Sequence, residues 1–171
     1  MNADSLSMNP AGGALESIET LLPALHKALA RYEVTLAYLY GSQARGNAGP
    51  LSDVDLAVLF RSDLASTERF QQLLAVTGEA MDIFQREDVF VADLADATPL
   101  LRFQVYQEGR LLYCRDDAIR VKFMMEALRD YEDTRPLREI QRKYLLQRIA
   151  NGTFSRQRAM MAEKRAKYGA K

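Results

Sequence analysis

The stretch YGSQARGNAGPLSDVDL, residues 40–56, joins two short apolar segments. These segments, Val34–Tyr40 and Val54–Phe60, are rich in β-branched, aromatic and aliphatic residues, and this composition predicts two buried strands. Gly41 ends the first strand, and the glycines and proline that follow it indicate a change of direction. The chain is therefore expected to leave the first strand, turn, and return as the second strand.

Polar residues in this stretch predict a site for a phosphate group and a divalent cation. Ten residues separate Ser42 from Asp53, enough for the returning strand to lie beside the turn. Gly41 lets the backbone approach a bulky anion, and Ser42 offers it a hydroxyl and a backbone N–H. If Gln43 to Arg45 begin a helical turn, its positive end points at the same place, and Arg45 can add a charge-assisted contact to phosphate. Asp53 and Asp55 should project from one face of the strand, where their mutual repulsion favours a bound Mg²⁺.

Hydrophobic periodicity and capping residues predict the remaining elements. A third strand is expected over Val89–Leu94 and a brief edge strand over Leu111–Cys114. Helices are expected around Leu15–Leu29, over Ser66 to about Arg86, from the Thr98-Pro99 cap to Gly109, from Asp116 to the break at Pro136, and over Leu137–Ala150. The helix that begins at Ser66 is expected to carry Phe70, Leu73, Leu74 and Met81 on its inner side.

Composition limits the classes of function. With 171 residues and 48% hydrophobic content, the chain can bury one core. Lys plus Arg equals Asp plus Glu, 23 against 23, so no global field favours nucleic acid or an anionic membrane. No segment approaches the roughly 18 apolar residues of a membrane span, and the beginning of the chain is unlike a signal peptide. With Cys114 as the single cysteine, the chain is expected to be cytoplasmic and to bind no membrane and no nucleic acid directly.

Two parts of the sequence resemble a known family. Gly41-Ser42, followed after ten residues by Asp53-x-Asp55, resembles the defining motif of the polymerase-β-like nucleotidyltransferase superfamily. The segments LLRFQVYQEGRLLY, residues 100–113, and YEDTRP, residues 131–136, look like the C-terminal half of the minimal nucleotidyltransferase (MNT) antitoxins. These antitoxins are encoded beside toxins of the HEPN ribonuclease class. The resemblance covers about residues 15–152.

The resemblance implies a fold and a division into domains. The fold would be α+β (mixed α/β), with a small mixed sheet, flanking helices that in the family lie on one side, and a helical C-terminal extension. The nucleotidyltransferase domain would span residues 14–114 and the helical extension residues 115–152. A flexible leader would precede them at residues 1–13, and a basic tail would follow at residues 153–171.

The resemblance also implies an activity. An antitoxin of this family transfers AMP from ATP to a tyrosine hydroxyl of its HEPN toxin, with which it forms a hetero-oligomer, and so silences the ribonuclease. Carried over to this sequence, Gly41 and Ser42 would hold the triphosphate, and Asp53 and Asp55 would bind Mg²⁺ as the catalytic carboxylates. Arg45 and Ser52 complete the set of candidate nucleotide-binding residues.

The third strand departs from the family pattern. The family usually supplies a third carboxylate there, and Phe90 occupies its place in the segment Val89–Leu94. Alternation puts Asp93 on the opposite face, whereas Asp88 shares the face of Phe90 and is a possible third metal ligand. Two alternatives therefore stand beside the enzymatic interpretation: a weak or inactive antitoxin that neutralises its toxin by binding alone, and a small-molecule (antibiotic) adenylyltransferase.

Overall fold

A computed structural model of the chain describes residues 18–47, 49 and 52–152. The chain divides into two compact units, residues 1–128 and 129–171. This division falls inside a helix and later than the domain boundary expected after residue 114. The leader and the tail expected at the two ends lie outside the described residues.

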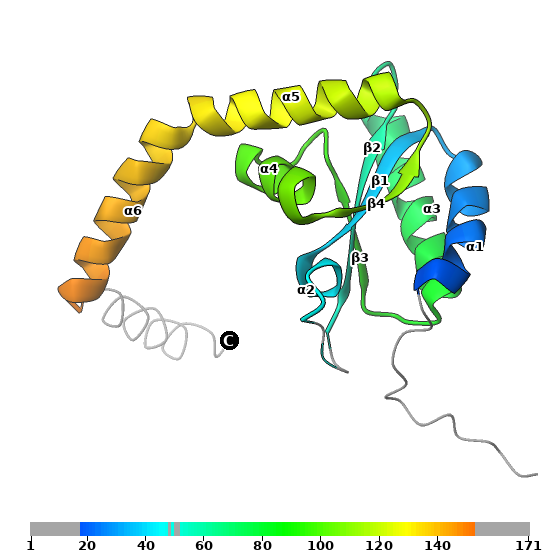
Figure 1. Cartoon of the computed structure of the whole chain (residues 1–171), viewed down its shortest axis with the longest axis horizontal. Helices are drawn as coiled ribbons and strands as arrows, with labels where there is room; N and C mark the ends of the chain where they lie inside the picture. The colour runs from blue at the N-terminus through cyan, green and yellow to red at the C-terminus, as the bar shows by residue number, and fades with distance from the viewer. Residues whose placement is uncertain (1–17, 48, 50–51, 153–171) are drawn as a thin grey trace, which may run out of the picture. The chain divides into compact units, whose positions relative to one another are not determined.

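A four-stranded mixed sheet forms the centre of the first unit (Figure 1). Its strands are β1 (Val34–Tyr40), β2 (Val54–Phe60), β3 (Val89–Asp93) and β4 (Arg110–Cys114). The order across the sheet is β3-β2-β1-β4, in which β1 runs antiparallel to both of its neighbours while β2 and β3 are parallel. The bounds of β1 and β2 are those that their apolar runs predict, because both central strands are buried along most of their length.

Two helices cover one face of this sheet, α1 (Ile18–Ala30) and α3 (Ser66–Phe84) (Figure 1). The apolar residues of β2, Val54, Leu56, Val58 and Phe60, alternate along the strand and are buried on this face. Each fully buried side chain of this size contributes roughly 1.5–3 kcal/mol through the hydrophobic effect. The packing of α1 and α3 therefore fixes which face of β2 carries Asp55.

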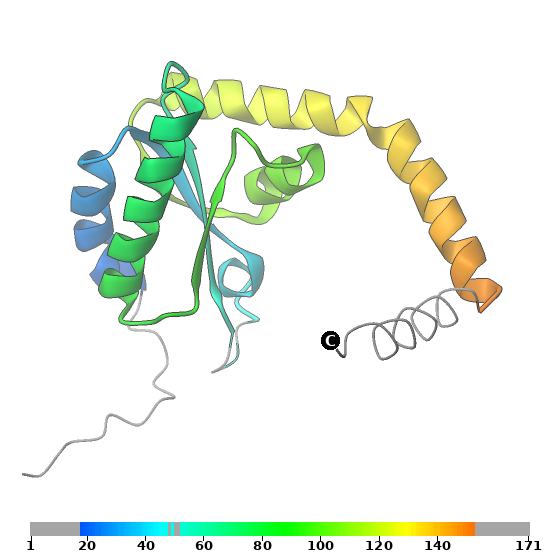
Figure 2. The same cartoon turned by 180° about the vertical axis from the view of Figure 1, so that it is seen from behind.

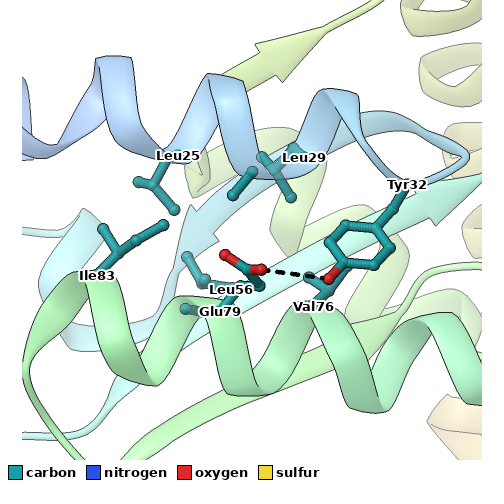
Figure 3. A pocket seen from close by; sticks show the side chains of 9 residues that line it. Leu25, Leu29, Tyr32, Leu56, Val76, Glu79 and Ile83 are labelled. Atoms are coloured by element: carbon teal, nitrogen blue, oxygen red, sulfur yellow. Dashed lines mark hydrogen bonds between the residues drawn. The ribbon is translucent and has the colours of Figure 1, made fainter.

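A pocket between α1, α3 and β2 is lined mainly by apolar side chains, among them Leu25, Leu29, Leu56, Val76 and Ile83 (Figure 3). Its polar group is Glu79, which accepts a hydrogen bond of 3.4 Å from the hydroxyl of Tyr32 and forms an ion pair with Arg31. The pocket belongs to the packing of the helices on the sheet and lies on the face opposite Asp55.

Helices also cover the second face, which corrects the expectation that they lie on one side. Val105 of α4 (Pro99–Glu108) and Phe123 of α5 (Asp117–Asp133) pack against Tyr38 and Ala57 of the sheet. Figure 2 shows the molecule from behind, with α4 on the side of the sheet away from α1 and α3. This face requires cover because the central strands are apolar on both sides, apart from the end that carries Asp55.

Local signals set the helix ends as expected. The side chain of Thr98 accepts a hydrogen bond of 3.3 Å from the N–H of Leu101 and caps α4. Asp116 accepts a hydrogen bond of 2.9 Å from the N–H of Ala118 at the start of α5. In the second unit, α6 (Arg135–Ala150) takes Pro136 into its first turn and ends before Gly152, whose φ is +64°.

The expected inner face of α3 was partly wrong. Phe70 and Leu74 are about 60% exposed, and the buried residues are Val76, Ala80 and Phe84. Leu74 lies about 100° around the helix from Leu73, which does pack against the core. The buried residues recur every four positions, and Phe70 and Leu74 lie outside that row although they are equally apolar.

No helix among the residues that the structure describes is long and apolar enough to span a membrane.

Candidate functional site

The candidate site lies at the edge of the sheet where β1 ends and β2 begins. The antiparallel pairing places Tyr40 opposite Asp55, so the turn that follows Tyr40 lies beside this carboxylate. That turn is the short helix α2 (Gly41–Ala44), which begins two residues before the helical turn expected at Gln43. Strand pairing thus brings together the turn and the acidic pair, which are ten residues apart in the sequence.

The backbone conformation of Gly41 favours glycine, and the side chain of Asp55 fills the space beside it. Its φ is +70°, in the left-handed region that favours glycine. A β-carbon at Gly41 would lie 2.1 Å from Oδ2 of Asp55, far inside van der Waals contact. The sequence suggested that this glycine makes room for an anion, and the anion in direct contact with it is the protein's own carboxylate.

Asp53 and Asp55 form a repelling pair of carboxylates. Alternation along β2 places both on the second face of the sheet, with Asp53 exposed and Asp55 half-buried. Burial raises the pKa of Asp55, the negative charge of Asp53 raises it further, and the charge of Arg45 partly opposes both effects. A divalent cation between the two carboxylates would remove this repulsion.

The donor set fits Mg²⁺, which proteins usually hold through one or two carboxylates together with water and substrate phosphates. Asp53 and Asp55 would bind the ion, and phosphate oxygens and water would complete its coordination. Among the residues that the structure describes, no group of three or more His, Cys, Asp or Glu side chains is arranged to hold a metal.

The other candidate nucleotide-binding residues lie around the turn. Nη1 of Arg45 lies 3.0 Å from the Oε2 of Glu108, and both side chains are about half exposed. The hydroxyl of Ser52 accepts a hydrogen bond of 2.9 Å from the N–H of Gly49, and so holds the loop before β2. Ser42 is half-buried in α2. The structure therefore brings Arg45 close enough to influence Asp55, while the Ser52 hydroxyl serves the loop.

The third strand presents Phe90 beside Asp55. The two are partners in the parallel pairing of β2 and β3, so they share a face of the sheet. The side chain of Phe90 is 59% exposed. Asp93 points to the other face, as expected, where it forms an ion pair of 2.6 Å with Arg69 of α3. The place next to Asp55 is therefore occupied by an exposed aromatic ring.

Asp88 precedes β3 and is paired with an arginine. Its Oδ1 accepts a hydrogen bond of 2.6 Å from Nε of Arg86, and its other oxygen contacts the same guanidinium group. This contact lowers the pKa of Asp88. Both carboxylate oxygens of the possible third ligand are thus engaged within the protein.

A sequence model of the family described as polymerase beta nucleotidyltransferase matches residues 24–118, which include β1, α2, β2 and β3. The chain belongs to this family. The matched region contains the Gly41 turn and both aspartates of the candidate site. A comparison with curated proteins found no match.

Solved structures resemble this nucleotidyltransferase in fold. A toxin–antitoxin with AMP-PNP is 23% identical, with a TM-score of 0.60, over 73% of this chain and 98% of the other. A tri-AMPylated HEPN toxin in complex with MNT antitoxin, from Shewanella oneidensis, is matched over 75% of this chain and 98% of the other, with 21% identity and a TM-score of 0.58. The toxin–antitoxin complex MntA–HepT is matched with the same values.

Sequence reasoning missed two residues around the site of this nucleotidyltransferase. Arg86 and Glu108 come from the loop after α3 and the end of α4, and only the folded chain brings them to Asp88 and Arg45. Tyr40, which ends β1 at the site, has a raised hydroxyl pKa because of its burial and then the charge of Asp55. The sequence shows the Arg86-x-Asp88 spacing, but it does not reveal that these two side chains form an ion pair with each other.

His26 lies outside the site and contacts strand β4. Its side chain is exposed, and its Nε2 lies 2.5 Å from the carbonyl oxygen of Leu112. The ring also packs edge-on against Tyr113. These contacts join α1 to β4.

Proposed function

We propose that this nucleotidyltransferase is an antitoxin that transfers AMP from ATP to a tyrosine hydroxyl of a HEPN ribonuclease toxin, in a Mg²⁺-dependent reaction. The acceptor oxygen forms a bond to the α-phosphorus, the bond from that phosphorus to the β-phosphate oxygen breaks, and pyrophosphate leaves. The hydroxyl proton passes to solvent. The antitoxin and its HEPN toxin would form a hetero-oligomer in the cytoplasm.

The observation that carries the proposal is the contact between Gly41 and Asp55. The turn at Gly41 lies against the carboxylate of Asp55, so a triphosphate bound to this turn would have its charged oxygens close to Asp53 and Asp55. Mg²⁺ bound there would neutralise charge on the phosphates and pyrophosphate. The chain itself supplies Gly41 and Ser42 to hold the triphosphate.

Arg45 and Ser52 would assist in binding the nucleotide. The guanidinium group of Arg45 is half exposed, and exchange of Glu108 for a phosphate oxygen would give it a charge-assisted hydrogen bond. Ser52 fixes the loop that leads into Asp53 through its bond to Gly49.

The similar solved structures support the choice of nucleotide and acceptor. One contains the ATP analogue AMP-PNP, and another contains a HEPN toxin that carries three AMP groups. A further MntA–HepT structure is a mutant in which two aspartates, two positions apart, are replaced by glutamate. That spacing is the spacing of Asp53 and Asp55.

Intact-mass spectrometry tests the proposal. The chain is mixed with the HEPN protein encoded beside it, ATP and Mg²⁺, and the partner's mass is measured before and after. We expect the partner's mass to rise by whole AMP units on a tyrosine-containing peptide. A partner whose mass stays unchanged while its ribonuclease is still inhibited would overturn transfer as the mechanism.

Phe90 favours a second candidate function, neutralisation by binding alone. An aromatic ring beside Asp55 supplies neither a metal ligand nor a base. Asp53→Asn distinguishes the candidates, because it removes a carboxylate while leaving the rest of the surface intact. Full neutralisation by this variant supports the binding candidate, whereas loss of both transfer and neutralisation supports the enzyme. Asp63→Asn, an exposed aspartate beyond the far end of β2, is the matched control.

A further inference from the structure

Asp88 lies next to the carboxylate pair in the sheet. The backbone N–H of Val54 donates a hydrogen bond of 3.0 Å to the carbonyl oxygen of Asp88, and Val54 pairs with Val89. Asp53 and Asp88 are the residues immediately before this pair. The backbone therefore places Asp88 beside Asp53, at the starts of the neighbouring strands β3 and β2.

Arg86 holds that side chain in one orientation. Its Nε donates to Oδ1 of Asp88 at 2.6 Å, and its Nη2 contacts Oδ2. The same Nη2 donates a hydrogen bond of 2.9 Å to the carbonyl oxygen of Ser52, the residue before Asp53. With only 20% of its side chain exposed, Arg86 links the starts of β2 and β3 through three contacts.

The backbone around Arg86 makes this arrangement rigid. Gln85 ends α3 with a φ of +52°, and the N–H of Arg86 donates a hydrogen bond of 3.1 Å to the carbonyl oxygen of Met81. The left-handed turn thus fixes the Cα of Arg86 against the end of the helix. Because the backbone of Arg86 is held in place, its guanidinium group lies close enough to the site to interact with the charge of Asp53.

The other place for a third ligand is closed by Phe90. This residue pairs with Asp55 and shares its face, so a carboxylate there would complete a group of three. Glu108, an acidic side chain close to the turn, is paired with Arg45, so arginines engage both Asp88 and Glu108.

We infer that Arg86 is a positioning residue that withholds Asp88 from the metal and so limits the site to a single divalent ion, held by Asp53 and Asp55. The inference rests on the proposed function, because it takes the metal to lie at this pair. A two-metal site needs ligands for a second ion. In this chain, Arg86 engages Asp88, and Phe90 stands where a further carboxylate would lie beside Asp55.

Mn²⁺ binding to the full chain, followed by the electron paramagnetic resonance signal of free Mn²⁺, tests the inference without any measurement of activity. We expect a single Mn²⁺ per chain. Asp53→Asn should lower the affinity by about tenfold or more, as for loss of a ligand or its close support. Asp88→Asn should change it by less than about twofold, because Arg86 already engages both carboxylate oxygens of Asp88. A second ion on the unaltered chain, or a loss with Asp88→Asn that equals the loss with Asp53→Asn, overturns the inference.

Replacement of the arginine gives the complementary test. Arg86→Gln removes a positive charge beside Asp53 and releases Asp88, so Mn²⁺ affinity should rise by about threefold or more. Arg69→Gln is the matched control, because Arg69 also lies on the α3 side, has the same side-chain exposure and pairs with a β3 aspartate. Equal responses of the two variants contradict the positioning role. If Arg86→Gln fails to fold, the result with Asp88→Asn decides.

Failure of the proposed function looks different. A chain that binds one Mn²⁺ with the expected variant pattern, but leaves its HEPN partner without AMP, refutes the transfer and leaves the role of Arg86 intact. A chain that transfers AMP while Asp88→Asn abolishes Mn²⁺ binding refutes the inference alone. A chain that binds no Mn²⁺ refutes both.

Discussion

The carboxylate of Asp55 occupies the space that a β-carbon on Gly41 would need, with a separation of 2.1 Å between that carbon and Oδ2. This relationship joins the end of β1 to the start of β2. Glycine at position 41 therefore suits both the left-handed backbone of the turn and the position of the Asp55 side chain.

Gly41→Ala should therefore destabilise the protein more than backbone strain alone predicts. Gly46 provides the control, because its φ is also +70° and a β-carbon there meets nothing within 4 Å. Left-handed backbone costs a non-glycine residue about 1–3 kcal/mol, and Gly46→Ala should show that cost alone. Chemical denaturation measures both free energies of unfolding, and equal losses would mean that the contact with Asp55 is unimportant.

Asp55→Asn should stabilise the protein in the presence of EDTA. Burial and the charge of Asp53 raise the pKa of Asp55, so the folded state favours its protonated form more than the unfolded state does. As pH rises through the window between the ordinary and the raised pKa, the unaltered protein loses stability that it does not regain at neutral pH. Thermal unfolding of both proteins from acidic to neutral pH checks this. A variant that melts below the unaltered protein at neutral pH argues against a repelling pair.

Arg45→Gln should weaken nucleotide binding with little effect on stability. Its ion pair with Glu108 is half exposed, and such pairs contribute about 0–1 kcal/mol to folding. A charged hydrogen bond to phosphate is stronger, so affinity for a non-hydrolysable ATP analogue should fall about tenfold by calorimetry.

Arg61→Gln controls for the loss of an exposed arginine. Arg61 has the same 50% side-chain exposure, is also paired with a glutamate, and lies at the far end of β2. If the two arginine variants bind the nucleotide equally well, Arg45 has no place in the site.

Phe90→Asp should strengthen Mn²⁺ binding by about tenfold, because it places a third carboxylate beside Asp55. AMP transfer should rise with it if the natural site is limited by the missing acid. Phe70→Asp is the control, since Phe70 is 60% exposed and Phe90 is 59% exposed. Unchanged Mn²⁺ affinity in Phe90→Asp would show that the ring does not stand where a ligand could reach the ion.

Much of the fold follows from local sequence. The strands β1 and β2 are continuous apolar runs ended by glycine or polar residues, and their bounds can be predicted because both faces are buried. The caps at Thr98 and Asp116 are also local, since each side chain bonds a backbone N–H two or three residues away.

Long-range packing explains what could not be predicted. Apolar residues occur on more than one side of α3, and only packing against the sheet selects Val76, Ala80 and Phe84 for burial while Phe70 and Leu74 stay exposed. The cover that α4 and α5 give to the second face depends on contacts between distant segments.

The candidate site also contains residues that the local sequence predicts and residues that depend on long-range packing. Asp53 and Asp55 are recognisable from their spacing, because strand alternation and a short return connection bring them to the turn. The orientation of Asp88 depends on where α3 ends and on the left-handed conformation of Gln85, neither of which its own sequence neighbourhood specifies. The sequence therefore identifies candidate ligands, and the fold determines which of them are free to bind.

The fate of the ATP phosphates tests the central claim most directly. The chain and its HEPN partner are incubated with Mg²⁺ and ATP that carries label on either the α- or the γ-phosphorus. We predict that α-label becomes covalently attached to the partner, that γ-label appears in pyrophosphate, and that Asp53→Asn abolishes both. Partner that carries γ-label, or no label while the partner's ribonuclease is silenced, would contradict AMP transfer by this site.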